Sequence, residues 1–255
     1  MVSRIKQTDQ SLQPLQHLIS QYAGKLWIPG SIILLIVFLF WPKSNESASH
    51  VDNHAVKILA LGDSITQGGN GHPSYRRSLW FLLKEAGYRV DFVGSETAFN
   101  GAVPKKLRDF DQDHEGHWGW EAGEIDAYLA TWLQDYDADI ALIHAGTNDV
   151  DRGQSVESTL AELLSIVTKL RADNPEIVLL LAKIIPLRGV DATVFNNALE
   201  SWTIEHHSEQ SPLVVVDQFS GYDAQTDNYD KWHPNSFGEE KMAMRWFTAL
   251  KPYLH

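Results

Sequence analysis

From residue 56 onward, short apolar runs alternate with segments whose apolar residues recur at helical spacing. Several runs are apolar without alternation, which is typical of strands covered on both faces of a parallel sheet. The expected strands are 56–61, 89–93, 139–144, 177–182 and 213–216, and the expected helices are 75–86, 121–134, 156–172, 193–207 and 235–250. This alternation predicts a three-layer α/β/α domain over residues 56–255, with five parallel strands and crossover helices.

Another apolar run, 26–42, precedes this domain and contains no charged residue. Crossing a bilayer takes about 17 to 25 residues, and Trp27 and Trp41 stand at the two ends, where indole rings favour the headgroup region. Basic residues before the run place the N-terminus in the cytoplasm. We therefore expect a cytoplasmic tail over 1–25, a single transmembrane helix over 26–42, a linker over 43–55 and an extracytoplasmic, membrane-anchored domain.

A cleaved signal peptide is the alternative, with small residues at 47–49 as the cleavage site and a secreted product. The 25-residue polar lead is long for a signal peptide, so the sequence favours the anchor.

Composition excludes several classes of function. The formal net charge of -12 argues against a nucleic-acid partner, because binding phosphates requires a basic face. With no cysteine, the chain has no disulfide, thiolate metal site or cysteine nucleophile.

Four polar segments follow predicted strands. Ser64 lies directly after the first strand, in Gly-Asp-Ser-Ile-Thr, and Gly119 lies in the connection after the second. Asn148 follows the third strand, and Asp230 and His233 follow the fifth. Ligands of open parallel sheets bind beyond the carboxyl ends of the strands. We therefore expect all four segments to project from one edge of the sheet.

These residue types are those of a serine esterase. Serine is a weak nucleophile, so Ser64 needs a base, for which His233 is the candidate, and Asp230 would orient the imidazole. The Ser64 N–H, the Gly119 N–H and the Asn148 amide would stabilise the oxyanion that forms on the substrate. Taken singly, Ser64, His233 and Asn148 would each be better explained as a turn, surface or cap residue, and it is their combination that favours catalysis.

Three tryptophans, Trp118, Trp120 and Trp232, lie close to these segments in the sequence. Aromatic faces suit sugar rings, and packing at the rim of a site is the alternative. The His-rich connection has the composition of a metal site, but its His-x-x-His spacing does not place a third ligand. We expect a hydrogen-bonded loop there, without a metal.

The segments Gly62-Asp63-Ser64-Ile65-Thr66, Gly119, Gly146-Thr147-Asn148-Asp149 and Asp230-Lys231-Trp232-His233 resemble the four signature blocks of the SGNH (GDSL-type) hydrolases. The resemblance implies a flavodoxin-like SGNH fold, the roles given above for Ser64, Asp230, His233, Gly119 and Asn148, and no cofactor. Further segments, 74–80, 91–95 and 114–117, are similar to the acetylxylan esterases of carbohydrate esterase family 3, which implies acetylated carbohydrate as substrate. Trp118 departs from that pattern, since a small residue such as serine is expected there.

Two other functions fit parts of this pattern. A lysophospholipase or lipid esterase would work at the membrane that the predicted anchor reaches. A membrane-tethered glycan-binding module with an inactive triad is the other alternative, although every expected catalytic position is filled.

Overall fold

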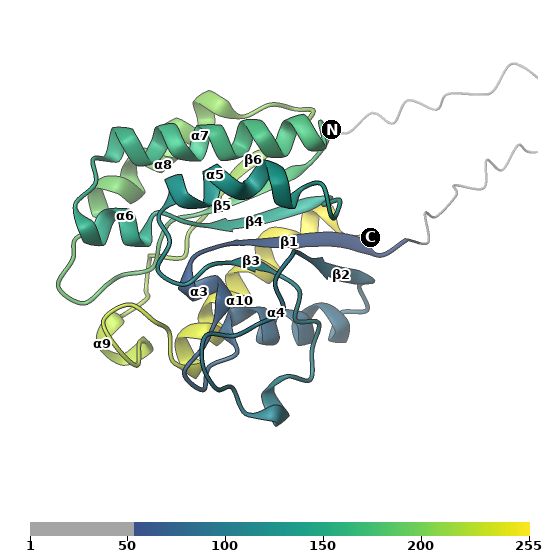
Figure 1. Cartoon of the computed structure of the whole chain (residues 1–255), viewed down its shortest axis with the longest axis vertical. Coiled ribbons are helices and arrows are strands. Elements are labelled where there is room, and N and C mark those ends of the chain that lie inside the picture. Colours follow the sequence, from purple (N-terminus) through teal and green to yellow (C-terminus); the bar gives the residue numbers. More distant parts are fainter. Residues whose placement is uncertain (1–53) are drawn as a thin grey trace, which may run out of the picture. The chain divides into compact units, whose positions relative to one another are not determined.

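The computed structural model describes residues 54–255 (Figure 1). The predicted tail 1–25, the predicted transmembrane helix 26–42 and most of the linker 43–55 lie outside these residues and stay predictions. Within residues 54–255, no helix combines the length and the apolar character needed to cross a bilayer.

The strands form a single sheet in the order β2-β1-β4-β5-β6, and all neighbours on this path are parallel. Their bounds are β1 (Val56–Gly62), β2 (Val90–Val93), β4 (Ile140–His144), β5 (Val178–Ala182) and β6 (Leu213–Val216). The five predicted strands are therefore confirmed to within a residue at each end. A two-residue strand that was not predicted, β3 (Glu115–Gly116), pairs with the end of β1.

Helices cover both faces of the sheet, as predicted (Figure 1). One layer contains α5 (Ala122–Trp132), α7 (Val156–Asp173) and α8 (Thr193–His206), and the other contains α4 (Ser74–Glu85) and α10 (Ser236–Leu250). Alternate residues of β1 enter the two cores: Leu59 and Leu61 pack with the first layer, and Ile58 packs with the second. Burial on both faces explains why β1 is a continuous apolar run.

Short helices complete the described fold. They are α3 (Ser64–Gln67), α6 (Thr147–Arg152), α9 (Ala224–Asp227) and two 3-10 turns, η1 (Lys105–Leu107) and η2 (Lys251–Tyr253). None of them was predicted, because a helix of three to six residues is too short to display an apolar period. Two of them, α3 and α6, start directly after β1 and soon after β4, at the carboxyl edge of the sheet.

Gly62 lets the ends of β1 and β4 approach each other closely. It pairs with His144 across the ladder, and a Cβ at Gly62 would lie 2.2 Å from the His144 carbonyl oxygen and 2.7 Å from Thr66 Oγ1. Because only glycine avoids both contacts, this position fixes α3 tightly against the sheet edge.

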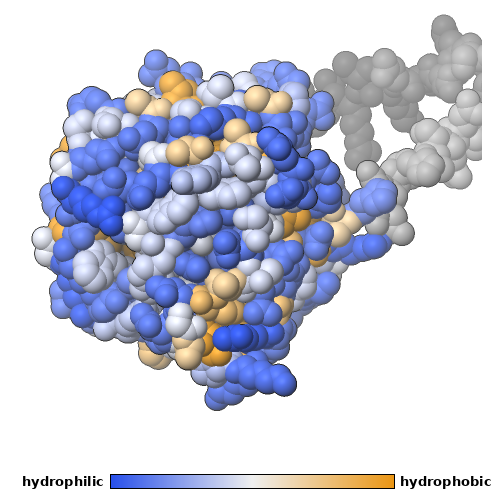
Figure 2. Space-filling model, in the orientation of Figure 1, coloured by the Kyte–Doolittle hydropathy of each residue, from blue (hydrophilic) through white to orange (hydrophobic). Residues whose placement is uncertain are grey.

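The surface in Figure 2 is mostly hydrophilic, with small scattered apolar patches. This agrees with the burial of most large apolar side chains in the two cores.

Candidate active site

Ser64 is the first residue of α3. The preceding Asp63 caps this helix, because its Oδ1 accepts a hydrogen bond of 2.9 Å from Ile65 N. Backbone N–H groups in the first turn of a helix have no partner within the helix, so the Ser64 N–H is available to another acceptor. The Ser64 side chain lies in a small hollow and is 6% exposed, which leaves its hydroxyl reachable by a small group.

Ser64, His233 and Asp230 form one hydrogen-bonded chain. His233 Nε2 lies 2.9 Å from Ser64 Oγ, and His233 Nδ1 lies 2.7 Å from Asp230 Oδ2. A carboxylate accepts only, so Nδ1 carries the proton and Nε2 is free to accept the serine proton. The structure thus brings together the three residues that the sequence grouped as a triad.

Asp230 is held as a carboxylate. Its Oδ1 accepts from the backbone N–H groups of Trp232, at 2.8 Å, and His233, at 2.7 Å. Partial burial raises the pKa of the Asp230 carboxyl, but the hydrogen bonds from the His233 ring and from these N–H groups outweigh it and hold the pKa below its usual value. The turn 230–233 therefore presents the base and its charged partner as one rigid unit.

The imidazole of His233 lies within a column of stacked rings. Trp118 covers it on one side, at 4.4 Å between ring centroids and 25° between planes, and Tyr229 lies 5.6 Å away at 16°. Tyr229 in turn stacks on His72, at 4.5 Å and 9°. Stacking against Trp118 and Tyr229 restricts rotation of the His233 ring.

Two residues of α6, Asn148 and Arg152, bond to the backbone of the segment that contains Gly119. Gly119 has φ of +79°, a conformation that strongly favours glycine, and its carbonyl oxygen accepts from Arg152 Nη2 at 2.9 Å. Asn148 Nδ2 donates to the Trp120 carbonyl oxygen at 2.7 Å. A side-chain amide has two N–H donors, so this bond fixes the orientation of the amide and leaves the second N–H for another acceptor.

Asp149 caps the start of α5 with its side chain. Both of its carboxyl oxygens lie 3.1 Å from Ala122 N, at the start of α5. Burial, opposed by this backbone hydrogen bond, raises the pKa of the Asp149 carboxyl to about 7. The α6 helix thus holds segment 119–122 through three of its side chains.

The three predicted tryptophans have different surroundings. Trp118 lines the hollow beside Ser64, and Trp232 lies 6.0 Å from the His233 ring, with its Nε1 donating to Asp151 at 2.8 Å. Trp120 instead stacks on His117, at 4.4 Å, and packs against Trp132 of α5. Of the three, Trp118 is the one that forms part of the wall around the serine.

The polar side chains of the His-rich connection bond to one another and to backbone. Glu115 accepts from Ser95, Tyr136 and His117, while His114 Nδ1 accepts from Gly116 N. Within residues 54–255, no three His, Asp or Glu side chains are grouped so as to hold a metal ion.

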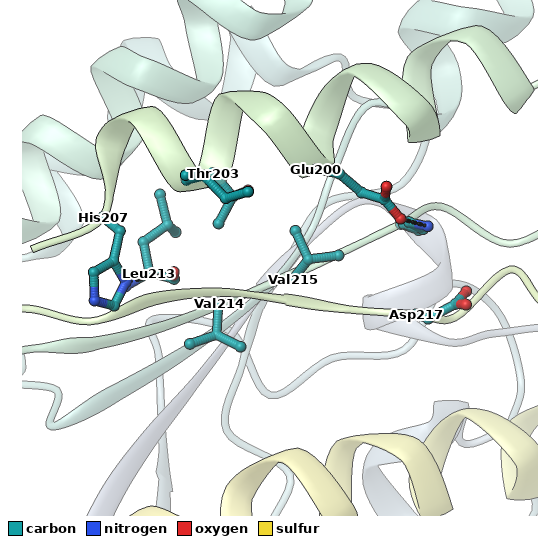
Figure 3. A pocket seen from close by; sticks show the side chains of 9 residues that line it. Glu200, Thr203, His207, Leu213, Val214, Val215 and Asp217 are labelled. Atoms are coloured by element: carbon teal, nitrogen blue, oxygen red, sulfur yellow. Dashed lines mark hydrogen bonds and ion pairs between the residues drawn. The ribbon is translucent and has the colours of Figure 1, made fainter.

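A larger hollow, of about 690 Å³, lies between α8 and the edge strand β6 (Figure 3). Its walls are mostly apolar, and Figure 3 shows Val215 pointing towards α8 and Val214 away from it. Of its polar groups, Lys183 pairs with Glu200, and Asp217 accepts from the backbone N–H of Phe219. The hydroxyl of Thr203 is buried and has no hydrogen-bond partner among residues 54–255. The hollow beside Ser64 is much smaller, about 10 Å³, but it is the one that holds a nucleophile next to a base.

Sequence reasoning missed Arg76, Tyr229 and Arg152. Arg76 is fully buried and donates to the carbonyl oxygens of Thr66 and Gln67, which end α3. One signal was present for Arg76: it lies three residues before Leu79 on the buried face of its helix, where a charged residue has to find internal partners. Tyr229 and Arg152 carry no such local signal.

The chain matches the GDSL-like Lipase/Acylhydrolase family over residues 60–241, and it belongs to that family. The predicted resemblance to the GDSL-type hydrolases is therefore confirmed.

Solved structures of family 3 carbohydrate esterases are similar to this chain. The enzyme from Talaromyces cellulolyticus is 33% identical, with a TM-score of 0.68 over 78% of this chain and 97% of that chain. A mutant acetyl esterase crystallised with an acetate ion matches with the same values. The family 3 carbohydrate esterase of Clostridium thermocellum is 27% identical, with a TM-score of 0.68 over 78% of this chain and 96% of that chain.

A curated relative, the multidomain esterase of Ruminococcus flavefaciens, is 29% identical over 227 residues, or 78% of this chain. The chain spans only 29% of the length of that relative.

Proposed function

We propose that this protein is a serine esterase that removes short acyl groups, acetyl above all, from esterified carbohydrate. The observation that carries the proposal is the hydrogen-bonded chain from Ser64 Oγ through His233 to Asp230, with distances of 2.9 Å and 2.7 Å. The 33% identity to a carbohydrate esterase and the small hollow beside the serine support the substrate class.

The reaction starts with attack of Ser64 Oγ on the carbonyl carbon of the ester. His233 Nε2 takes the hydroxyl proton as the new C–O bond forms, and Asp230 stabilises the resulting imidazolium. The carbonyl electrons move to oxygen, where the N–H groups of Ser64 and Gly119 and the second amide N–H of Asn148 stabilise the charge.

Collapse of this tetrahedral intermediate breaks the bond to the alcohol. His233 returns its proton to the departing oxygen, so the sugar leaves with a free hydroxyl and the acyl group stays on Ser64. A water molecule, deprotonated by His233, then attacks the acyl-enzyme and releases the carboxylic acid. The cycle consumes one water and returns Ser64 and His233 to their starting protonation states.

The test of this proposal is hydrolysis of p-nitrophenyl acetate and release of acetate from acetylated xylan. Ser64→Ala removes the nucleophile and should lower kcat by at least about 10³-fold, since what remains without the nucleophile is binding and the oxyanion hole. Ser236→Ala is the matched control, because Ser236 is exposed and lies three residues after His233. Retention of full activity in Ser64→Ala would disprove the proposal.

Asn148→Ala tests the oxyanion assignment separately. Removing one such donor lowers kcat by about 10²- to 10³-fold while KM changes little, because the bond forms in the transition state. A loss of less than about tenfold would exclude Asn148 as an oxyanion donor and leave Ser64 in place. A preference for long acyl chains in the same assays would instead favour the lipid-esterase alternative.

A further inference from the structure

The turn that carries Asp230 and His233 is tied to α6 through the carboxylate of Asp151. Asp151 Oδ1 accepts a hydrogen bond from Lys231 Nζ, and Asp151 Oδ2 accepts one of 2.8 Å from Trp232 Nε1. Lys231 Nζ also lies 5.0 Å from the centre of the Trp232 ring, a cation–π contact. The Asp151 side chain is only 15% exposed, so both bonds are partly shielded from water. These three side chains form one cluster between the turn and the helix.

The α6 helix is itself held firmly in the fold. Gly146, which precedes it, has φ of +105°, and a Cβ there would lie 2.8 Å from Phe195 Cζ, so the helix starts close against α8. Asp149 is fully buried and bonds to the start of α5. The same helix carries Asn148, the candidate oxyanion donor. Asp151 therefore joins the turn that carries the base to the helix that carries this donor.

We propose that Asp151 is a positioning residue that sets the distance between the base His233 and the oxyanion donor Asn148. This role rests on the proposed function, because it assumes that both groups act on the same ester. Proton transfer and oxyanion stabilisation occur in one transition state, so the two groups have to keep one mutual geometry. Trp232 then holds the turn in place of the predicted contact with sugar, because its N–H is taken by Asp151.

The expected effect is on turnover. A shift of about 1 Å in a reacting group can lower the rate about 10²-fold. Asp151→Ala removes both bonds to the turn and should lower kcat for p-nitrophenyl acetate by about 10- to 100-fold, with KM within about threefold of the wild type. Asp151→Asn keeps an oxygen for Trp232 Nε1 but loses the charge that pairs with Lys231. Its kcat should therefore lie between those of Asp151→Ala and the wild type.

Asp126→Ala is the matched control. Asp126 is 20% exposed and pairs with Lys169 at 2.8 Å, so it forms a similarly buried ion pair that joins α5 to α7. Its loss should leave kcat unchanged. Circular dichroism melting measures the stability of each variant and identifies any that does not fold. If Asp151→Ala is such a variant, Asp151→Asn and Trp232→Phe provide the same kinetic test.

A double-mutant cycle tests the path through Trp232. Trp232→Phe removes the Nε1 donor and keeps an aromatic ring. If Asp151 acts through this bond, the double variant should have nearly the same kcat as Asp151→Ala alone, because the bond is already lost. Losses in kcat that multiply in the double variant would show that the two residues act independently, which would overturn the proposed link.

Three further results would contradict the role of Asp151. A kcat within about twofold of the wild type in folded Asp151→Ala would overturn it and leave the proposed function intact. An increase in KM with an unchanged kcat would also overturn it, since Asp151 would then contribute to uniform binding of the substrate. An equal loss of kcat in Asp126→Ala would show that any such ion pair has this effect. Activity that persists in Ser64→Ala would overturn both proposals, so the two failures are distinguishable.

Discussion

Two helices hold the site through side-chain hydrogen bonds: α4 holds the segment with the nucleophile, and α6 holds the segment with the oxyanion donors. The bonds on these two sides differ in how far they are buried. On the nucleophile side, three consecutive residues of α4, Ser74–Arg76, bond to α3. On the oxyanion side, three residues of α6, Asn148, Asp149 and Arg152, bond to segment 119–122. The three bonds on the nucleophile side are buried. On the oxyanion side the Asp149 bond is buried, the Asn148 bond is partly buried and the Arg152 bond is exposed.

The nucleophile side is part of the core. Ser74 Oγ donates to the Ile65 carbonyl at 3.0 Å, and Tyr75 OH lies 3.1 Å from Thr66 Oγ1. Arg76 donates to three carbonyl oxygens, those of Thr66, Gln67 and Gln112, at 2.8 to 3.0 Å. Burial lowers the pKa of the Arg76 guanidinium to about 10, which still leaves it charged at neutral pH. The position of Ser64 is therefore coupled to the stability of the whole domain.

The oxyanion side depends on more exposed contacts. The Arg152 side chain is 52% exposed and bridges the Gly119 carbonyl and the Glu121 carboxylate, at 2.9 Å to each. Hydrogen bonds in such a position contribute little to stability, because water can replace them. The hydrogen bonds on the nucleophile side therefore contribute mainly to the stability of the fold. Those on the oxyanion side contribute mainly to the positioning of the oxyanion donors.

The largest expected effect is on the nucleophile side. Arg76→Met leaves three buried carbonyl oxygens without a donor and should lower the free energy of unfolding by about 3–5 kcal/mol. Urea denaturation followed by circular dichroism measures this. Arg77→Met is the matched control, because Arg77 pairs with Asp109 near the surface and should change stability by less than about 1 kcal/mol. Similar losses of stability in Arg76→Met and Arg77→Met would show that the buried bonds of Arg76 do not account for the effect.

The strands and the residues at their carboxyl ends could be predicted from the sequence because both depend on residues that are adjacent in the chain. An apolar run buried on two faces is visible in the chain, and parallel strands bring their ends to one edge. The partners of Arg76 could not be predicted, since Gln112 is 36 residues away and only the folded loop brings its carbonyl near. The separate surroundings of Trp118 and Trp120, two residues apart, likewise depend on the loop conformation that positive φ at Gly119 imposes.

The next effect concerns the oxyanion side. Arg152→Met frees the Gly119 carbonyl and should lower kcat about tenfold, because an oxyanion donor that shifts loses transition-state stabilisation. Stability should change by less than about 0.5 kcal/mol, as for other exposed positions. Steady-state kinetics and urea denaturation give the two values. In Arg152→Lys the positive charge remains, but a single amine replaces the two guanidinium nitrogens that reach Gly119 and Glu121. The kcat of this variant should therefore lie between those of the wild type and Arg152→Met. If Arg152→Met lowered the stability but kept its kcat, Arg152 would contribute to folding and not to the positioning of the oxyanion donors.

The final expected effect is a pH dependence of stability that arises on the α6 side. The pKa of Asp149 is raised to about 7 in the folded protein, above its usual value in an unfolded chain. The folded state therefore binds more protons between pH 4 and 7, and its stability falls as pH rises through this range. The slope for one group is at most about 1.4 kcal/mol per pH unit.

Asp149→Asn removes the charge and keeps an oxygen that can accept from Ala122 N, so this slope should be absent in the variant. The measurement is the free energy of unfolding of both proteins at pH 4, 5.5, 7 and 8.5. We expect the wild type to lose stability relative to the variant up to about pH 7 and to follow it in parallel above that. On the α4 side, the pKa values of Arg76, about 10, and Tyr75, about 12, lie above this range, so those groups add no slope. A difference between the two proteins that stayed constant from pH 4 to 8.5 would show that Asp149 has the same pKa in the folded and unfolded states, and would contradict this prediction.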